Sequence, residues 1–352
     1  MEPMKVVIAG GSGALGRALV GALQRAGHEP HVLTRADSGR VAGAPAHTWD
    51  GRTAGAWAQV LSPDRRDQRV AVVNLAGKLV DCPPTDANIA ALRDSRVEAT
   101  RALVTASQEH PVDVWLQVST TAIWSHGGDT RLTEDSPVPT GVDALPQMTG
   151  VAAPWEAAVE GAGLQAGGRL VTLRTSIVLQ HDAPAFGRLV SLARTGAGGT
   201  VGSGAQWFSW IHVDDWLRIA FTALGLEPGP GLRFRPSSDR SGRNAGSRAS
   251  APDADSGPLT LPSGVVIAAA PNPVTNARLM RALRERRAPL RQVIPGGLGM
   301  PAPGPILSLG AAVLHTDPAL GLTGRHTTSR VLDDLGFEFE HPDLDGALAT
   351  LF

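Results

Sequence analysis

Three glycines spaced three residues apart have the spacing of a phosphate-binding turn. Gly10, Gly13 and Gly16 come directly after the apolar run 6–9, which is typical of a buried strand. Between a strand and a helix, such glycines permit a tight turn, a close approach to a pyrophosphate and close packing of the helix. The helix N-terminus then favours the negative phosphates. We predict a dinucleotide site, rather than a mere tight turn, that comprises Gly10, Ser12, Gly13, Ala14, Leu15, Gly16 and Arg17.

The end of the second predicted strand indicates which dinucleotide is bound. An NAD site usually has Asp or Glu there, which accepts hydrogen bonds from the ribose hydroxyls. This chain has Thr34 and Arg35 instead. A guanidinium suits a 2′-phosphate, and Arg17 in the first helical turn could add a second contact. NADP is therefore the predicted cofactor; the alternative is that Arg35 is a solvated loop residue.

A short polar residue and a glycine end the strand predicted at 70–75. The run Asn74, Leu75, Ala76 and Gly77 would let the backbone pass close under a ribose of the cofactor. The alternative is an ordinary exit from a strand into a loop. We include these four residues in the predicted cofactor site.

The elements around these motifs predict an α/β fold. Apolar runs at 6–9, 31–34, 70–75, 114–119 and 170–174 alternate with helical patterns at 14–26, 89–109 and 155–162. This order predicts a Rossmann-type, doubly wound parallel sheet over residues 1–175. Such sheets bind their ligand at the carboxyl edge.

The pattern of residues 176–352 predicts a smaller substrate-side and C-terminal domain. Some of its elements are expected to pack against the Rossmann core. We expect a glycine-rich loop at 196–204, an aromatic strand at 207–213, a strand at 265–268, a helix at 276–287 and a helix-turn-strand segment at 325–339. The stretch 233–263 is dominated by Ser, Arg, Asp, Gly and Pro, which predicts a mobile insertion that trypsin cuts first.

Composition limits the partners. The 352 residues carry a formal charge of −1 with interspersed signs, which predicts neither nucleic-acid nor membrane binding. A single cysteine, Cys82, excludes a disulfide framework and a multi-cysteine metal site, and we expect no metal. With neither a signal peptide nor a membrane span in the pattern, we expect a cytoplasmic protein whose partners are a small-molecule substrate and, at most, a second copy in a homodimer.

The chain resembles the extended and atypical short-chain dehydrogenase/reductase superfamily, and within it the NAD-dependent epimerase/dehydratase-like "epimerase family" group with a C-terminal domain of unknown function. The matching pieces are 10–16, 32–35, 74–77, 94–100, 173–179, 202–215, 270–275 and 335–337, of which 206–215 and 270–275 are specific to this group. The resemblance implies a dinucleotide-binding fold, but fold and family do not fix the chemistry.

This sequence departs from the superfamily's catalytic pattern. The resemblance places Thr121 at the hydroxyl position after the fifth strand, and Met148 and Ala152 where members carry Tyr and Lys. Neither Met148 nor Ala152 can transfer a proton, and the chain has no tyrosine at all.

Three other groups are candidates for the proton carrier. Lys78 follows the 74–77 turn, His126 follows Thr121 by five residues, and His212 lies in the predicted strand 207–213. An unperturbed histidine titrates near pH 6.5, which suits acid/base chemistry. The alternative is a solvated loop for Lys78 and a structural strand-to-helix junction for His212, where Asp214 or Asp215 would be the helix N-cap.

Two further predictions concern large side chains outside the predicted cofactor site. The tryptophans Trp124, Trp207 and Trp210 could wall an apolar pocket, although tryptophans more often belong to a core. Arg174 resembles a buried structural arginine of extended members rather than a catalytic one.

Three functions remain open from the sequence. The first is an NADP-dependent oxidoreductase or epimerase-like enzyme that uses Thr121 with His126 or Lys78. The second is a non-redox enzyme, such as a cyclase, dehydratase or isomerase, on the same scaffold. The third is a catalytically silent NADP-binding regulatory protein.

Overall fold

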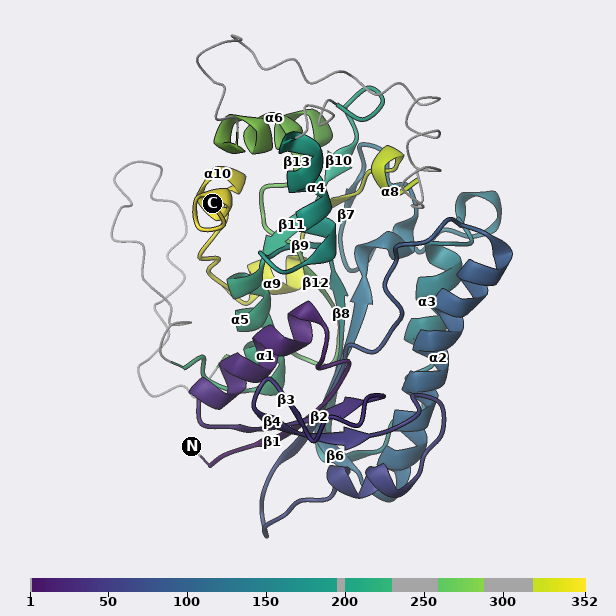
Figure 1. Cartoon of the computed structure of the whole chain (residues 1–352), viewed down its shortest axis with the longest axis vertical. Helices are drawn as coiled ribbons and strands as arrows, with labels where there is room; N and C mark the ends of the chain where they lie inside the picture. Colours follow the sequence, from purple (N-terminus) through teal and green to yellow (C-terminus); the bar gives the residue numbers. More distant parts are fainter. Residues whose placement is uncertain (1, 195–199, 230–258, 288–318) are drawn as a thin grey trace.

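The computed structural model describes residues 2–194, 200–229, 259–287 and 319–352. Its centre is an 8-stranded sheet with the order β12-β8-β6-β5-β1-β2-β4-β3 (Figure 1). All neighbouring strands are parallel except β3 and β4, which are antiparallel. The strands are β1 (Lys5–Ala9), β2 (Glu29–Thr34), β3 (Arg40–Val41), β4 (Ala44–Thr48), β5 (Val70–Asn74), β6 (Val112–Thr120), β8 (Leu164–Thr175) and β12 (Gly264–Ala268). The predicted α/β fold with a Rossmann-like parallel sheet is confirmed.

Helices cover both faces of this sheet. Figure 1 shows α1 (Ala14–Arg25) and α5 (Val213–Leu224) on one face, and α2 (Asp86–Glu109) and α3 (Thr149–Ala157) on the other. Leu19 and Leu23 of α1 share one core with Phe221 of α5. Leu103 of α2 belongs to a second core with Trp115 of β6. Burial on both faces explains why β1 is apolar at every residue after Lys5.

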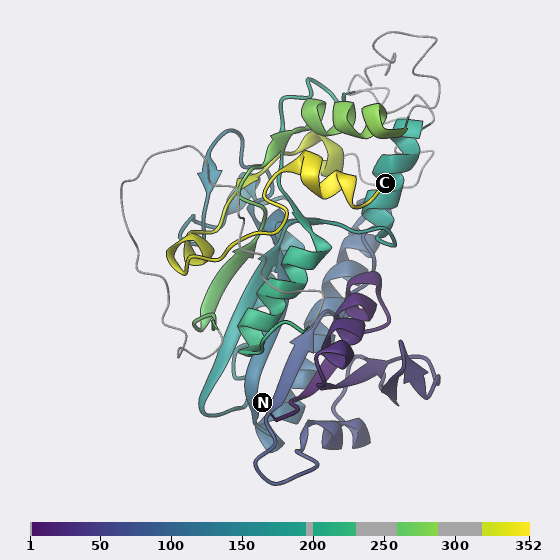
Figure 2. The same cartoon turned by 90° about the vertical axis from the view of Figure 1, so that its left-hand side faces the viewer.

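The rest of the chain builds a second layer of short elements. Three pairs of strands are β7 (Arg131–Leu132) with β14 (His326–Thr327), β9 (Ile177–Leu179) with β11 (Trp210–His212), and β10 (Trp207–Phe208) with β13 (Val274–Thr275). The helices are α4 (Pro184–Arg194), α6 (Asn276–Arg287), α8 (Ala319–Leu322), α9 (Arg330–Asp334) and α10 (Leu344–Ala349), with short 3-10 turns η1 (Ala56–Leu61), η2 (Thr121–Trp124) and η3 (Gly141–Asp143). Figure 2 shows α6, in green, at one end of the molecule. A third core joins Phe186, Leu279 and Leu348 there.

Several element boundaries differ from the sequence-based predictions. The helix predicted at 155–162 is α3, which begins at Thr149 and ends at Ala157. The strand predicted at 207–213 is two short strands, β10 and β11, and α5 already begins at Val213. In the segment 325–339, β14 precedes α9 and no strand follows it. Instead, the rings of Phe337 and Phe339 pack edge to face at 5.0 Å.

The predicted insertion 233–263 lies outside the described residues as far as residue 258, and so does the part 196–199 of the glycine-rich loop 196–204. The last residues of the insertion, 259–263, are described, and one of them packs in the core. Leu261 is buried, and its amide donates to the carbonyl of Thr222 at 3.2 Å. The predicted boundary at residue 263 is therefore too late. Among the described residues, no helix combines the length and the apolar character that crossing a bilayer requires.

Candidate functional site

The glycine turn between β1 and α1 has the close approaches that its sequence predicts. Gly10 has a φ of 81°, and a Cβ there would lie 2.6 Å from the carbonyl oxygen of Leu75. A Cβ at Gly16 would lie 2.5 Å from the carbonyl oxygen of Gly10. The turn can therefore form only with glycine at both positions, because either side chain would collide with backbone.

A cleft of about 560 Å³ opens beside this turn. Residues from four predicted segments line it: Gly10, Ser12 and Gly13, then Thr34 and Arg35, then Leu75, Ala76 and Gly77, and finally Lys78. Two more walls were not predicted from the sequence, and they are residues 49–52 after β4 and one face of α2. A concave site at the carboxyl edge of a parallel sheet is where this fold class holds its ligand.

The remaining predicted cofactor residues, Ala14, Leu15, Gly16, Arg17 and Asn74, do not line this cleft. Arg17 turns back and donates to the carbonyl of Ser12. The Asn74 amide is buried and donates to Thr100 at 2.8 Å and to Gln117 at 3.0 Å. Its oxygen accepts from the amide of Ala76 at 3.1 Å. Asn74 thus shapes the turn that borders the cleft.

Some of the charged side chains that line the cleft have an ion-pair partner and others do not. Arg35 is exposed and forms no ion pair in the part of the chain that the structure describes. Arg52 pairs with Glu98 at 3.0 Å, which joins the segment after β4 to α2. Bonds from the hydroxyl and amide of Thr53 lower the pKa of Asp50 to about 2, so this carboxylate is ionised at neutral pH. Arg35 is therefore the lining guanidinium that remains available to a ligand.

The turn after β5 is fixed to α2, which begins at Asp86 because Thr85 caps it by accepting from the amide of Asn88. The amide of Lys78 donates to the Ser95 hydroxyl at 3.0 Å, and Arg96 donates to the carbonyl of Lys78 at 3.0 Å. Burial lowers the pKa of Arg96 to about 10. The Lys78 side chain itself is exposed at the cleft.

Thr121 and His126 belong to one short segment after β6. Thr121 opens η2 and is buried, and its hydroxyl makes no hydrogen bond with any described residue. His126 is exposed, and its Nδ1 accepts from the amide of Gly324 at 3.1 Å. The lone pair on Nδ1 is thereby used, which leaves Nε2 to exchange a proton. Between them, Ser125 has a φ of 52°, which is uncommon outside glycine.

The position that the resemblance gives to tyrosine is occupied by a buried methionine beside an arginine. Met148 is 2% exposed and Ala152 is 1% exposed. Nη1 of Arg325 lies 3.5 Å from the sulfur of Met148 and 3.3 Å from the hydroxyl of Thr323, and it also donates to the carbonyl of Ser125. Burial lowers the pKa of Arg325 to about 10, so the group stays cationic. In the part of the chain that the structure describes, no carboxylate forms an ion pair with Arg325. Arg325 was not predicted from the sequence, because long-range packing brings it here.

Arg174 is a structural arginine, as predicted. Its guanidinium donates twice to Glu156, at 3.0 and 2.9 Å, and lies 4.8 Å from the ring of Trp124. Ser119 donates to the same carboxylate at 2.6 Å. The pair joins β8 to α3 and holds α3 against the strand that ends at η2.

The tryptophans do not form a common wall. Trp124 and Trp210 are buried core residues, at 2% and 0% exposure. Trp207 stacks on His326 with ring centroids 4.0 Å apart and donates to Asp129 at 3.0 Å. The favoured alternative, that these tryptophans belong to a core, therefore holds for Trp124 and Trp210.

His212 lies at a strand-to-helix junction, as the structural alternative predicts. The N-cap of the helix is the histidine itself. His212 is the N-cap of α5 and accepts from the amide of Asp214 at 3.2 Å, so the expectation of an aspartate cap is wrong. Asp215 is buried against Arg218 at 3.1 Å. It also accepts from the amides of Glu340 and His341, at 2.7 and 2.9 Å, and so holds the C-terminal segment against α5.

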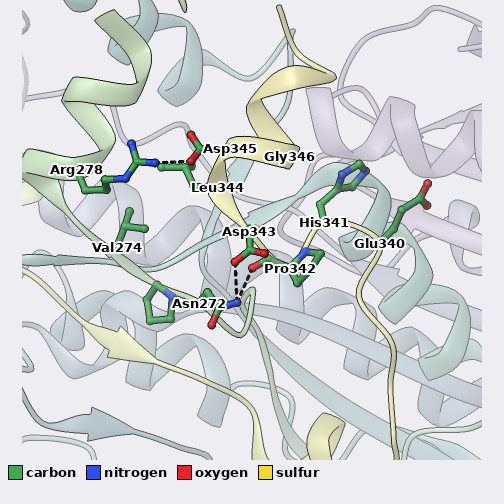
Figure 3. Close-up of a pocket in the computed structure, with 11 residues that line it drawn as sticks. Asn272, Val274, Arg278, Glu340, His341, Pro342, Asp343, Leu344, Asp345 and Gly346 are labelled. Atoms are coloured by element: carbon green, nitrogen blue, oxygen red, sulfur yellow. Dashed lines mark hydrogen bonds and ion pairs between the residues drawn. The ribbon is translucent and has the colours of Figure 1, made fainter. Parts of the chain in front are cut away.

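A second cleft, also of about 560 Å³, lies between the 272–278 segment and the C-terminal segment (Figure 3). Several of its polar groups are already paired with one another. Asn272 donates to Asp343 at 2.9 Å, and Arg278 pairs with Asp345. The cleft beside the glycine turn, where Arg35 has no such partner among the described residues, is the better candidate for a charged ligand.

Comparisons with known proteins agree with this placement. The model of the family described as "NAD dependent epimerase/dehydratase family" matches residues 6–144, which contain the glycine turn and the cleft. Epimerase family protein SDR39U1 from Bos taurus is 32% identical over 226 residues, which are 63% of this chain and 70% of the bovine protein. A chloroplastic homologue from Arabidopsis thaliana is 28% identical and covers 99% of this chain and 86% of its own length.

Solved structures show the same fold. Human epimerase family protein SDR39U1, solved with NADPH, has a TM-score of 0.71 at 24% identity and covers 99% of both chains. UDP-glucose 4-epimerase from Thermus thermophilus, solved with NAD, has a TM-score of 0.63 at 16% identity, with 99% of this chain and 98% of that one covered.

Proposed function

This chain belongs to the epimerase family, whose model carries the NAD-dependent epimerase/dehydratase description, and on that premise we propose that it is an NADP(H)-dependent oxidoreductase or epimerase-like enzyme. Its substrate is a small organic molecule with a carbonyl or hydroxyl group. The chemistry differs from the superfamily pattern, because Met148 and Ala152 replace the tyrosine and lysine.

The observation that supports this proposal most strongly is the cleft at the glycine turn, which Arg35 lines. The residues present fit a dinucleotide, because the turn excludes side chains at Gly10 and Gly16 and brings the backbone close to the cleft. Thr34 and Arg35 occupy the end of β2, where an acidic residue would repel a 2′-phosphate. The exposed guanidinium of Arg35 favours NADP(H) over NAD(H). The NADPH in the human SDR39U1 structure supports the same choice.

When bound, the nicotinamide supplies or accepts a hydride, and the chain's own residues must handle the oxygen and its proton. Thr121 is a buried residue that offers a hydroxyl with no other partner in the described part of the chain. His126 offers Nε2 as the proton donor, since its Nδ1 accepts from Gly324. Arg325 holds a positive charge beside Met148, where it would stabilise negative charge on the substrate oxygen. Lys78 is the alternative proton carrier at the cleft.

A panel of small carbonyl compounds tests this function directly. Purified protein is mixed with NADPH and each compound, and loss of nicotinamide absorbance is followed. We expect NADPH oxidation with at least one member of the panel. If NADPH binds but no compound is reduced, the oxidoreductase proposal fails.

That outcome would favour the second candidate, a silent NADP-binding regulatory protein. The specific observation behind it is the burial of Met148 and Ala152, which fills the superfamily's proton-transfer positions with apolar atoms. A non-redox reaction on the same scaffold would instead appear as product formation that does not require the nicotinamide.

We also propose a cytoplasmic location and, as the partner besides the substrate, a second copy of the chain. The single cysteine supports a reducing compartment. The relative from Arabidopsis thaliana is named as chloroplastic, so location differs within the family. Light scattering on a sizing column distinguishes a monomer from a homodimer.

A further inference from the structure

Two histidines and an aspartate from distant parts of the chain meet where α5 begins. His212 ends β11, Asp214 lies in the first turn of α5, and His341 belongs to the loop that leads into α10. Their ligand-type atoms all lie within 4.8 Å of one another. Neither the cofactor cleft nor the segment around Thr121 uses these three residues.

The distances fit a tetrahedral metal ion. Nδ1 of His212 lies 3.5 Å from Oδ2 of Asp214, and Nε2 of His341 lies 3.7 Å from the same oxygen. Tetrahedral zinc, with bonds of about 2.0–2.1 Å, places its ligand atoms roughly 3.3 Å apart. Shifts of a few tenths of an ångström would bring both of these pairs to that spacing.

The hydrogen bonds of His212 fix the tautomer that a metal requires. Thr350 donates its hydroxyl proton to the carbonyl of Ala347 at 2.8 Å. The same hydroxyl must therefore accept from Nε2 of His212, which lies 3.0 Å away. The lone pair of His212 is thus on Nδ1, where it now accepts the 3.2 Å bond from the amide of Asp214. A metal would compete with that one long bond, while Thr350 would orient the ring as an outer partner.

His341 supplies the observation that points to a ligand. It is 8% exposed, and its Nε2 is a buried atom with no hydrogen-bond partner among the described residues. A buried polar atom without a hydrogen bond costs free energy, and the Asp214 carboxylate, 3.7 Å away, is too distant for a good one. The position is not accidental, because Asp215 accepts from the amides of Glu340 and His341 at 2.7 and 2.9 Å. The fold therefore holds His341 with Nε2 turned toward Asp214.

We propose that His212, Asp214 and His341 bind one divalent transition-metal ion of the zinc type, with water completing the coordination. The Asp214 side chain is 40% exposed, which gives the ion and its water access to the site. Two imidazoles and one carboxylate are a ligand set that zinc and its neighbours accept. The ion would join the start of α5 to the C-terminal segment, and its expected role is structural.

Cobalt binding tests the proposal independently of any enzyme activity. The full chain, without a histidine tag and stripped with a chelator, is titrated with Co²⁺ and the visible absorption band is followed, after which Zn²⁺ displaces it. We expect one equivalent of Co²⁺ and a higher melting temperature with metal. His341→Gln and Asp214→Asn should each weaken binding at least about tenfold, because losing even an outer partner costs about 10–100-fold. Circular dichroism checks that each variant is folded.

The matched control is the pair His31 and His47, whose rings are stacked and whose Nδ1 and Nε2 lie 3.0 Å apart. His47→Gln removes one histidine of a histidine pair but should leave cobalt binding unchanged. Three results would overturn the proposal: no saturable band, binding that survives both His341→Gln and Asp214→Asn, or equal loss in His47→Gln.

Discussion

Nη1 of Arg325 lies 3.5 Å from the sulfur of Met148. This proximity puts a permanent cation beside the position where the wider superfamily carries its tyrosine. An arginine cannot replace a phenol as a proton donor, because it stays protonated in proteins. It can stabilise an oxyanion, which requires the proton to come from a neighbour. Under the proposed function, two residues share the tasks that one tyrosine performs in the wider superfamily.

Replacing the cation should slow turnover without weakening cofactor binding. We expect Arg325→Gln to lower kcat roughly 10²-fold, the usual effect of removing one oxyanion-stabilising donor. Arg325→Lys keeps the charge and should retain part of the activity. Steady-state kinetics with the identified substrate and an NADPH titration measure the two effects. A wild-type kcat in Arg325→Gln would show that Arg325 does not stabilise the reacting oxygen.

His126→Ala should lower turnover at least about tenfold, because a general acid typically contributes about 10²–10⁴-fold. NADPH affinity should change little, since His126 does not line the cofactor cleft. Thr121→Val should also slow turnover, by removing the hydroxyl that would hold the substrate oxygen. Pre-steady-state and steady-state rates check both variants.

The control for His126 is His110→Ala, at the C-cap of α2, which should keep the wild-type rate. If His126→Ala and Thr121→Val both keep it too, the proton comes from another group, and Lys78 is tested next with Lys78→Met.

Arg35→Glu should reverse much of the preference for NADPH over NADH. Removing one charge-assisted hydrogen bond costs on the order of 1.5–3 kcal/mol, which corresponds to about tenfold or more in the ratio of dissociation constants. Arg66→Glu is the matched control: it makes the same charge change at a side chain 96% exposed and outside the cleft. A preference that moves equally in both variants would reflect overall charge rather than an interaction with the 2′-phosphate.

Glu156→Ala should strongly destabilise the protein. The Arg174 and Glu156 side chains are only 8% and 15% exposed, so the change leaves a nearly buried guanidinium without its partner. Breaking a buried pair in this way costs about 3–5 kcal/mol. Arg65→Ala breaks the exposed pair with Glu29 and should cost about 1 kcal/mol or less. Urea denaturation compares the two, and similar midpoints would show that the Arg174 pair has no special role.

The glycine turn and the β-α order could be predicted because their signals are local. The spacing of Gly10, Gly13 and Gly16 is visible within one strand–turn–helix unit, although the backbone that crowds Gly10 is that of Leu75 after β5. The fold class follows from the alternation of elements. The predicted start of α2 at 89 is late, although Thr85 and Asn88 carry a visible capping signal. Recognising that cap would have extended the predicted helix toward the cofactor site, where one face of α2 lines the cleft.

Arg325 and His341 could not be predicted in the same way. Each reaches its neighbours through tertiary packing between residues far apart in the chain, Arg325 at Met148 and His341 at Asp214. Neither residue has a spacing motif of its own. The sequence could show that tyrosine is missing, but only packing shows which residues surround the position that tyrosine has elsewhere.

Binding of NADP(H) in the cleft beside the glycine turn is tested most directly by titrating the wild-type protein with NADPH and with NADH. Trp49 lines the cleft, so energy transfer from tryptophan to the bound nicotinamide gives the signal. We expect saturable binding of both, with NADPH at least about tenfold tighter, as one charge-assisted hydrogen bond to the 2′-phosphate requires. Equal affinities for the two, or no binding of either, would contradict the proposed cofactor site.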